Sequence, residues 1–443
     1  MCEGNGEEKT EWVSQLNPGD VIIDCRRALP FCITVTVKLS KRVPAGLMLD
    51  LEWYQAKDRT RVRQLYRATG SGRMVFSVIL EPGRYYLSAG LFSVDWFRCY
   101  VWMDHVQYLS IPAFEDHGTL TLAAWAKTSY RKFLDRYVNA VSDHAWRILR
   151  PEEGGDTVSE AIAYGMLLAL AHGDVVAFDK FWSYAQSYLN RHGLMAWRIH
   201  ANGMVIDSGS AADADQDMAY ALIRAGQKWF HESYLNAGIS MVQAMRRWES
   251  HKGYLKPGDA WAPVPEVFNP SYTCLSYYPV FSRVSHDPWW DEWAETSFGI
   301  LQSVQHSETG LWPDWVVLNG ALPQGFQSIF SYDALRVPWR LYVAASSGMA
   351  CELNPLGKKI SQFFLDHGLN FLHSAYSMSG DPLSSQISGA LVAISALTRY
   401  AFTSDSRIPE FLSYLAEWTA ESYYDAAIQA LVLASLAGLL TFI

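Results

Sequence analysis

Three aspartates are crowded into a short stretch that leads into an expected helix. In "SAADADQDMAYAL", residues 210–222, Asp213, Asp215 and Asp217 occupy every second position. A helix N-terminus favours negative charge, but one capping aspartate would satisfy it, and like charges four residues apart on one helical face repel. We therefore expect one aspartate to serve the helix start, one to bind the hydroxyl groups of a ligand, and one to pair with an arginine or a neighbouring loop.

Glu160 is a second candidate for acid–base chemistry. It falls in the first turn of a helix expected over 157–172, where the helix dipole alone would favour a carboxylate. The small residues Ala161, Ala163 and Gly165 follow it, so another group can approach this turn closely. A carboxyl group among small apolar residues is partly desolvated, which raises its pKa and lets it hold a proton near neutral pH.

Aromatic and charged side chains accompany these carboxylates in later segments. Asp333 lies near the start of another expected helix, with Arg336 and Arg340 following it on one face, so a purely structural Asp–Arg pair is the alternative to a catalytic role. Further candidates lie in loops or near helix starts, where binding residues often sit: Trp197, Arg198, Tyr272, Trp312, Asp314 and Tyr332.

Two regions with different hydrophobic periodicity must position these residues. Residues 1–115 contain short β-branched and aromatic runs separated by turn residues, which predict a small β-sandwich with strands near 20–25, 31–39, 47–54, 73–80, 83–92 and 99–109. Residues 116–443 show helical spacing, and twelve helices are expected, at 120–140, 157–172, 175–190, 213–226, 229–249, 271–282, 286–306, 329–347, 356–373, 386–401, 407–420 and 422–440. Such alternating pairs fit a closed double ring, the (α/α)6 barrel, so the fold class is mainly α.

Composition narrows the range of partners. The formal charge of −9 argues against a nucleic-acid partner, and the C-terminal apolar stretch is too short for a confident membrane span. The six cysteines form no CxxC pair and no histidine cluster has ligand spacing, so we expect no metal site and no cofactor. A disulfide among Cys25, Cys32 and Cys99 is left open. The 18 Trp and 24 Tyr either build a large core or offer flat faces for sugar rings.

Six segments together resemble glycoside hydrolase family 8, a family of bacterial endoglucanases, xylanases and chitosanases. They read "SEAIAYGM", "LMAWR", "ADADQDMA", "NPSY", "GLWPDW" and "YDALRVPWR" and follow the family's order. Any one motif alone would be weak, but six in series are specific. The resemblance covers roughly residues 120–443 and leaves the β region outside.

The resemblance implies an (α/α)6 barrel that hydrolyses a β-1,4-linked polysaccharide with inversion. It places Glu160 as the general acid, Asp333 as the general base, and Asp213 as the carboxylate that holds the sugar ring before the scissile bond. Tyr332 and Arg336 would flank the base. The same likeness assigns substrate binding to Trp197, Arg198, Tyr272 and Trp312.

Two departures from the family pattern leave alternatives open. Ala161 and Ala163 stand where the family favours glycine, and Ala212 stands where threonine is usual.

An endo-β-1,4-glucanase is the leading interpretation of the function, tied in some relatives to bacterial exopolysaccharide production. A xylanase or chitosanase is the alternative within the family, although the chitosan-cleaving branch is expected to place its base elsewhere. A non-catalytic polysaccharide-binding or assembly protein is the alternative outside enzymes.

The β region and the cellular location are less constrained. The β domain can be a sugar-binding module, with Trp53, Tyr54, Trp96 or Trp102 as platforms, or a structural or docking domain for a partner; we favour the latter because its aromatic residues alternate as core residues do. The first residues, "MCEGNGEEKT", are polar and show no export signal. We expect a periplasmic or secreted protein whose signal is not in this sequence, with a cytoplasmic location as the alternative.

Overall fold

The chain divides into two compact units. The first runs to Gly118 and includes Ala345–Glu352, and the second comprises Thr119–Ala344 and Leu353–Phe442. The domain boundary expected near residue 115 lies outside the described residues. The structure is a computed structural model that describes residues 16–27, 32–69, 73–79, 83–111, 122–318, 322–367, 372–385, 388–403, 412, 415, 420 and 422–440.

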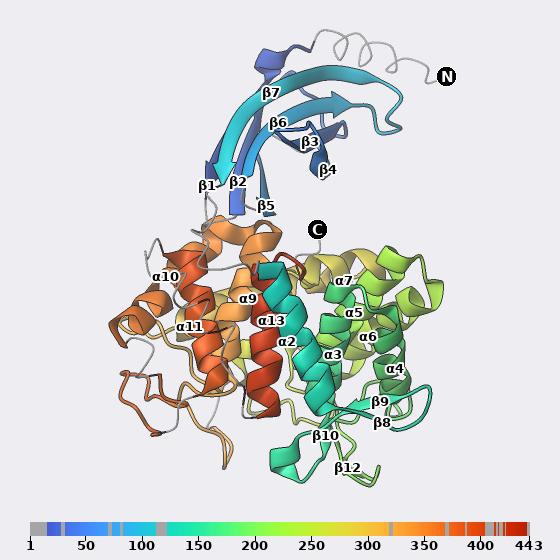
Figure 1. Cartoon of the computed structure of the whole chain (residues 1–443), viewed down its shortest axis with the longest axis vertical. Coiled ribbons are helices and arrows are strands. Elements are labelled where there is room, and N and C mark those ends of the chain that lie inside the picture. Colours follow the sequence, from blue (N-terminus) through green and yellow to red (C-terminus); the bar gives the residue numbers. More distant parts are fainter. Residues whose placement is uncertain are drawn as a thin grey trace. The chain divides into compact units, whose positions relative to one another are not determined.

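Within the described residues, seven strands belong to the first unit, and they form two antiparallel sheets (Figure 1). One sheet has the order β1-β2-β5 and the other the order β4-β3-β6-β7. The strands are β1 (Val21–Arg27), β2 (Cys32–Leu39), β3 (Met48–Gln55), β4 (Arg61–Ala68), β5 (Arg73–Ile79), β6 (Gly83–Phe92) and β7 (Cys99–Ile111), and the turn η1 (Pro18–Asp20) precedes them.

Alternating apolar residues supply the core of this unit. Val35 and Val37 of β2 and Leu49, Leu51 and Trp53 of β3 are fully buried. Period-two alternation places such residues on one face of each sheet. One strand, β4, was not among the strands expected from the sequence, because the charged residues of "RVRQLYRA" obscure the alternating pattern of a strand. Its extended conformation is stabilised by pairing with β3.

Eleven helices are seen in the described part of the chain that follows the β unit (Figure 1). They are α2 (Leu122–Tyr137), α3 (Ser159–His172), α4 (Val175–Gln186), α5 (Ala212–Trp229), α6 (Glu232–Trp248), α7 (Tyr278–Ser285), α8 (Trp289–Val304), α9 (Val337–Ala344), α10 (Ala350–His367), α11 (Gly389–Phe402) and α13 (Tyr423–Leu436). The helix expected over 407–420 lies almost wholly outside the described residues.

Two predicted helices differ from the structure for local reasons. The segment from residue 271 begins as the 3-10 turn η3 (Pro270–Tyr272), and the helix α7 starts only at Tyr278. The segment expected over 329–347 is divided into the turn η4 (Ala334–Arg336), α9 and the π-helical segment η5 (Ala345–Met349). In both places polar side chains are held at the turn, which displaces the regular helix.

The helices form an inner and an outer set. Nearly every residue of α3, α9, α11 and α13 is buried, whereas α2, α4, α6 and α8 each bury one face and expose another. An all-apolar helix is typical of a position surrounded by other elements. α3 packs against both α4 and α5, and α5 packs against α6.

Short strands and turns between the helices bring the helix starts together. They are β8 (Val138–Ala140), β9 (Trp146–Ile148), β10 (Thr157–Val158), β11 (Arg198–Ile199), β12 (Val205–Asp207), β13 (Ser250–His251), β14 (Tyr254–Leu255), β15 (Val267–Phe268), β16 (Val316–Val317) and the turn η2 (Pro151–Glu153). β10 and β12 both pair with β11, so the segments that lead into α3 and α5 are tied to one small sheet. The first turns of these two helices carry Glu160 and Asp213.

Candidate active site

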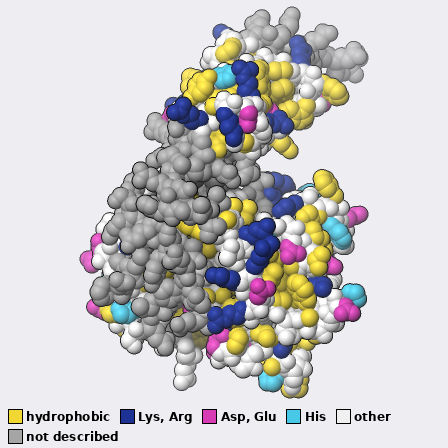
Figure 2. All heavy atoms as spheres, viewed as in Figure 1, with side chains coloured by type: hydrophobic (Ala, Val, Ile, Leu, Met, Phe, Trp, Pro, Cys, Tyr) yellow, Lys and Arg dark blue, Asp and Glu magenta, His cyan; other side chains and the backbone are white. Residues whose placement is uncertain are grey.

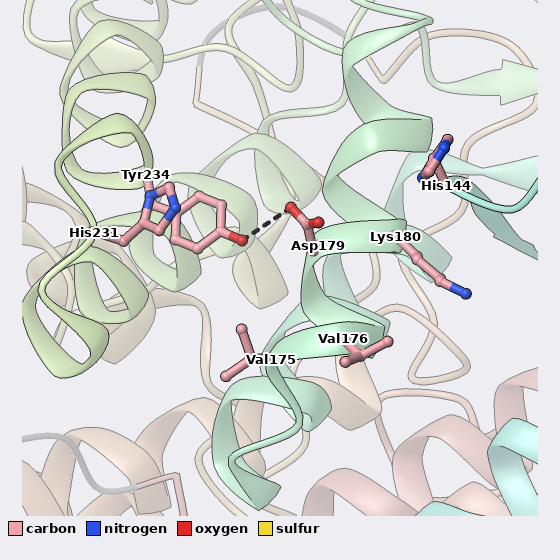
Figure 3. A pocket seen from close by; sticks show the side chains of 7 residues that line it. All are labelled: His144, Val175, Val176, Asp179, Lys180, His231 and Tyr234. Carbon is pink, nitrogen blue, oxygen red and sulfur yellow. Dashed lines mark hydrogen bonds between the residues drawn. The ribbon is translucent and has the colours of Figure 1, made fainter.

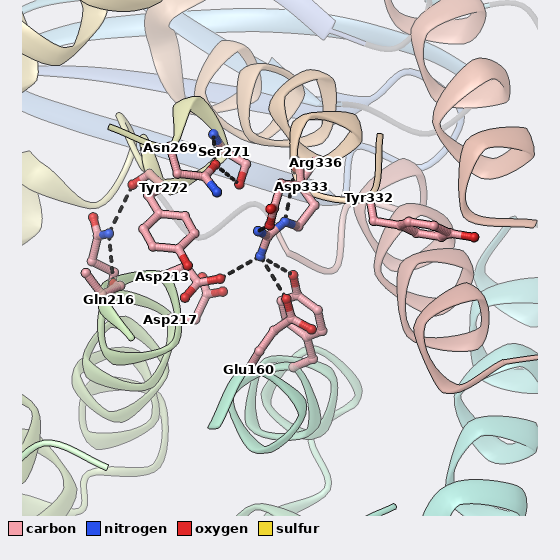
Figure 4. Close-up of polar contacts among 12 residues, drawn as sticks. Glu160, Asp213, Gln216, Asp217, Asn269, Ser271, Tyr272, Tyr332, Asp333 and Arg336 are labelled. Atoms are coloured by element: carbon pink, nitrogen blue, oxygen red, sulfur yellow. Dashed lines mark hydrogen bonds and ion pairs between the residues drawn. The ribbon is translucent and has the colours of Figure 1, made fainter. Parts of the chain in front are cut away.

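One buried arginine gathers three of the predicted carboxylates. Arg336 is 1% exposed, and its Nη1 lies 2.9 Å from Glu160 Oε2 and 2.6 Å from Asp213 Oδ2 (Figure 4). Its Nη2 lies 2.7 Å from Asp333 Oδ1. The planar guanidinium offers five donors in a fixed fork, so it can hold several carboxylates in a defined arrangement. Side chains from α3, α5 and η4 therefore meet at one point.

The start of α3 positions Glu160. The backbone N–H of Ser159 donates to the Trp197 carbonyl at 2.9 Å, which fixes the first residue of the helix to the segment leading into β11. No side chain caps this helix end, so its free N–H groups and dipole favour a nearby negative charge. The Tyr423 hydroxyl donates to Glu160 Oε1 at 3.2 Å, and this bond orients the carboxyl group from the opposite side.

Burial favours the protonated form of the Glu160 carboxyl group near neutral pH. The pKa of this carboxyl group is raised to about 7, chiefly by burial; the charges of Asp213 and Asp333 act in the same direction, and Arg336 and the Tyr423 hydroxyl oppose them. About a fifth of the side chain is still exposed. Glu160 can therefore hold a proton and remain accessible to a ligand, as a general acid requires.

Asp333 is held between two donors. Trp315 Nε1 donates to its Oδ2 at 2.9 Å, and Arg336 Nη2 binds its Oδ1. Burial raises the pKa of Asp333, and the adjacent Arg336 charge and the Trp315 hydrogen bond oppose this increase by stabilising the carboxylate. Roughly a third of the side chain, 35%, is exposed, so solvent reaches it.

Asp314 anchors the turn that carries Asp333. Its Oδ1 accepts backbone N–H bonds from Ser331 at 3.0 Å and from Ala334 at 2.8 Å, which fixes the chain on both sides of Asp333. Burial and the nearby Asp333 charge raise the pKa of Asp314 to about 6. Asp314 therefore acts on the position of Asp333.

Asp213 combines a strong ion pair with an unused acceptor. Its side chain is almost fully buried at the first turn of α5, where it binds Arg336. Within the described residues, no partner donates to its second oxygen, Oδ1. A buried carboxylate oxygen without a donor is costly, so a hydroxyl group of a ligand is a suitable partner for it.

The other two aspartates of the cluster have structural partners. Asp217 binds both terminal nitrogens of Arg340, at 2.6 and 2.7 Å, and accepts from the Tyr277 hydroxyl at 2.9 Å. Asp215 accepts from the Met195 backbone at 3.4 Å and lies beside Glu249. Burial raises the pKa of both members of this second pair, which disfavours charge on both at once. Asp217 thus pairs with an arginine, no side-chain hydrogen bond caps the start of α5, and ligand binding by Asp213 stays a prediction.

Removing the charge of Asp217 should destabilise the fold. In Asp217→Asn, Arg340 would remain charged and buried without its carboxylate, so we expect a loss of about 3–5 kcal/mol in the free energy of unfolding. Replacing both residues together, as Asp217→Leu with Arg340→Met, should recover part of this loss. Urea unfolding followed by tryptophan fluorescence measures both effects.

A partly exposed ion pair provides the matched control. Arg246 Nε binds Asp287 at 3.0 Å with both side chains at least a third exposed, so Arg246→Met should cost no more than about 1 kcal/mol. Equal losses in Asp217→Asn and Arg246→Met would contradict a structural role for the buried pair.

The remaining predicted residues divide between the cluster and its surroundings. The Tyr272 ring lies beneath Arg336, 5.6 Å from the guanidinium carbon. Tyr332 is 46% exposed, and its ring points away from Arg336 in Figure 4. Arg198 Nε binds Asp156 at 2.6 Å, and its guanidinium lies over the partly exposed ring of Trp197. Arg198 therefore has structural partners of its own, and within the described residues it forms no hydrogen bond or ion pair with the carboxylates held by Arg336.

The structure does not support substrate binding by Trp312. Its side chain is fully buried, and its Nε1 donates to the Leu301 carbonyl at 2.9 Å, so no ring face is available. Trp315, three residues later in the same "GLWPDW" motif, is partly exposed. Its ring stacks on Trp261 with centroids 5.5 Å apart and lies next to Phe326.

Sequence reasoning also missed Tyr423 and Trp261. Tyr423 opens α13, far along the chain from Glu160, and nothing in its local pattern signals this contact. Trp261 lies in the loop "YLKPGDAWAPVP". Loops often carry binding residues, so a tryptophan in this loop was the signal that could have identified Trp261. Aromatic rings next to Asp333 can stack on the apolar faces of sugar rings.

A hollow on the helical unit is separate from this cluster. Its lining residues come from the start of α4, the start of α6 and the β8–β9 turn (Figure 3): His144, Val175, Val176, Asp179, Lys180, His231 and Tyr234. Tyr234 donates to Asp179 at 3.0 Å across it. None of the three carboxylates bound by Arg336 lines this hollow.

Two further features bear on ligands and location. Among the described residues, no group of His, Cys, Asp and Glu has an arrangement that could hold a metal ion. No helix in the same part of the chain is both long and apolar enough to cross a membrane.

Similarity to known proteins establishes the family of this chain. The chain belongs to the glycosyl hydrolases family 8, whose pattern it matches over residues 77–437. This confirms the resemblance seen in the sequence. The match begins within β5, earlier than the motifs alone indicated, and so includes the last strands of the first unit.

Individual relatives and solved structures are similar to this chain to different degrees. Endoglucanase 2 of Ruminiclostridium josui is 34% identical over 249 residues, which are 54% of each chain, so this chain spans about half the length of that relative. The apo β-1,3-1,4-glucanase of Paenibacillus sp. X4 has a TM-score of 0.66 at 22% identity, with 74% of this chain and 94% of that chain covered. A reducing-end-xylose releasing exo-oligoxylanase has a TM-score of 0.65 at 20% identity, with 72% and 93% covered. These two structures share the fold.

Proposed function

We propose that this protein is an inverting endo-hydrolase of a β-1,4-linked polysaccharide, with β-1,4-glucan as the substrate. Glu160 donates a proton to the leaving oxygen, Asp333 activates the water, and Asp213 holds the sugar ring before the scissile bond. The observation that carries the proposal is the pair of partly exposed carboxyl groups held by one guanidinium, one of which has a pKa near 7. Inversion needs one protonated and one ionised carboxyl group.

The contacts with Arg336 set an upper limit on the distance between the two carboxyl groups, and this limit includes part of the range that inversion needs. Glu160 Oε2 and Asp333 Oδ1 bind different nitrogens of Arg336, at 2.9 and 2.7 Å. The two bonds and the fork between them keep these oxygens at most about 8 Å apart. Inverting glycosidases use a separation of roughly 6.5–9.5 Å, which leaves room for a water molecule.

The departures from the family pattern do not favour a non-catalytic role. Ala161 and Ala163 are fully buried within α3, so their methyl groups pack in the interior and do not cover the exposed part of Glu160. Xylan stays the rival substrate, because an exo-oligoxylanase shares the fold. The endoglucanase relative and the stacked Trp261–Trp315 pair favour a glucan chain.

We also propose that the helices close into an (α/α)6 barrel and that the two sheets of the first unit form a β-sandwich. The inner and outer sets of helices support the first proposal. The opposed apolar faces of β2 and β3 support the second. Periplasmic or secreted location stays a prediction from the substrate class.

A polysaccharide panel tests the proposed activity. Carboxymethylcellulose, xylan and chitosan would be incubated with the full chain, and released reducing ends and the anomer first formed would be followed, the latter by proton NMR. We expect fastest release from carboxymethylcellulose, with product of inverted configuration. Retained configuration would contradict the assigned roles, and no release from any polymer would favour a binding protein.

The pH profile should reflect the two carboxyl groups. We expect kcat/KM to be bell-shaped, with the acid limb set by protonation of Asp333. The alkaline limb should fall from about pH 7, because Glu160 loses the proton it must donate. At pH 9 the rate should be about a hundred-fold below the maximum. Activity that rises from pH 7 to pH 9 would contradict Glu160 as the acid.

A further inference from the structure

The two faces of the four-stranded sheet in the first unit differ in composition. Leu49, Leu51 and Trp53 of β3 point to one face and are fully buried. The alternate residues Asp50 and Glu52 point to the other face, since side chains alternate along a strand. The strand register places Gln64, Tyr66, Tyr86, Ser88, Gly90, Trp102 and Tyr108 on that second face. We call this second face the polar–aromatic face.

We propose that the polar–aromatic face binds a polysaccharide chain at a site separate from Glu160. The choice of a β-1,4-linked glucan as its ligand rests on the proposed function. The face combines exposed rings at its two ends with hydrogen-bonding groups between them, and both features match a polymer of sugar rings.

Trp102 forms a flat platform at one end. Gly90 lies opposite it on β6, and a side-chain carbon at Gly90 would come within 2.7 Å of the Trp102 ring. The indole therefore lies over bare backbone with one face against the sheet, while 41% of the residue is exposed. Tyr66, 61% exposed, lies in the same row at the other edge of the sheet and packs edge-on against Trp96 at 5.4 Å. This end offers ring surface for the apolar face of a sugar.

A second group of rings lies at the other end. Tyr86 stacks on Tyr54 at 5.2 Å and on His105 at 4.0 Å, and Tyr108 is 68% exposed beside them. Four residues of β3 separate the row of Tyr54 from the row of Asp50 and Trp102, or about 13 Å along the strand. The two groups are thus far enough apart for an oligosaccharide rather than a single sugar ring.

Polar side chains occupy the strip between the rings. Asp50 accepts from Gln64 Nε2 at 3.0 Å, and Asp104 accepts from the Ser88 hydroxyl at 2.5 Å. Glu52 is bound by Tyr54 and Arg61. Asp50 and Glu52 are more than nine-tenths buried, and they fix the exposed side chains of Gln64 and Arg61 in place. These two side chains and the exposed Asp104 are preorganised to bind the hydroxyl groups of a sugar.

The same features exclude other partners. Three carboxylates on the face disfavour nucleic acid, whose phosphates need cations. A hydrophobic protein surface would have to cover Arg61 and Asp104, which are about half exposed, without giving hydrogen bonds in return. In the view of Figure 2, the described part of this unit exposes hydrophobic side chains among charged ones. A neutral polyhydroxylated chain satisfies both the rings and the carboxylates.

Binding to insoluble cellulose tests the proposal. The full chain would carry Glu160→Gln in every sample so that the polymer is not degraded, and the bound fraction would be measured by sedimentation. We expect Trp102→Ala to weaken binding about ten-fold, and Tyr108→Ala, at the opposite end, to weaken it by a similar factor. Trp248→Ala is the control, because Trp248 is also a half-exposed tryptophan, 38%, but ends α6 in the helical unit.

The outcome is distinguishable from failure of the proposed catalytic function. With Glu160 intact, Trp102→Ala and Tyr108→Ala should hydrolyse soluble carboxymethylcellulose at the parent rate and insoluble cellulose more slowly. If no polymer is hydrolysed but both variants still lose binding, the catalytic proposal fails and this one holds. Parent-like binding by folded Trp102→Ala and folded Tyr108→Ala proteins, or an equal loss in Trp248→Ala, would overturn it.

Discussion

Glu160→Gln is expected to lower kcat on a β-1,4-glucan by at least about a thousand-fold, because the leaving oxygen would lose its proton donor. Glutamine has nearly the same shape as a protonated glutamic acid, and burial already keeps Glu160 largely protonated below pH 7. Oligosaccharide affinity should therefore remain within a few-fold of the parent. Initial rates and isothermal titration calorimetry measure the two quantities.

An activated substrate isolates the role of the acid. Aryl glycosides with a good leaving group depart without protonation, so Glu160→Gln should retain much of its activity on them. Glu292→Gln, an exposed position on α8, is the matched control and should behave as the parent on both substrates. Equal losses on the natural and the activated substrate would assign Glu160 another role.

Asp333→Asn is expected to lower activity on both substrates, by a factor of about a hundred to ten thousand, because attack by water is required whichever group leaves. The amide oxygen can still accept from Trp315 or Arg336, so the fold should change little. A small anion such as azide should partly restore turnover by taking the place of the activated water and should give a product of inverted configuration.

The charge on Asp333 also acts on Glu160. The Asp333 carboxylate raises the pKa of Glu160, so Asp333→Asn should lower that pKa, which NMR titration of the side-chain carboxyl carbon would detect. The exposed Asp143 gives a control variant, Asp143→Asn, for which neither rate nor pKa should change. Full activity in Asp333→Asn would require another residue to serve as the base.

Much of the framework follows from local sequence. The change from period-two to helical spacing separates the two regions, because each backbone conformation repeats its side-chain direction with its own period. Six motifs in order identify the family, and the residues they carry include Glu160, Asp213 and Asp333. The uneven roles of the three aspartates could also be anticipated, since three like charges at one helix start need separate partners.

Choices between neighbouring residues depended on tertiary packing. Trp312 and Trp315 share one motif, yet one is enclosed by the core and the other donates to Asp333. β4 forms from a charged sequence because β3 offers it a partner edge. Local pattern cannot distinguish such cases, because burial is determined by elements distant along the chain.

The sequence by itself indicated which side chains could react, because the proposed acid, base and ring-binding carboxylate, Glu160, Asp333 and Asp213, all lie in recognisable motifs. Only the tertiary structure decided that they meet at a single guanidinium and that Tyr423, from the last described helix, reaches Glu160. The physical reason is that a carboxyl group's pKa depends on burial and on nearby charges, which come from segments far apart in the chain.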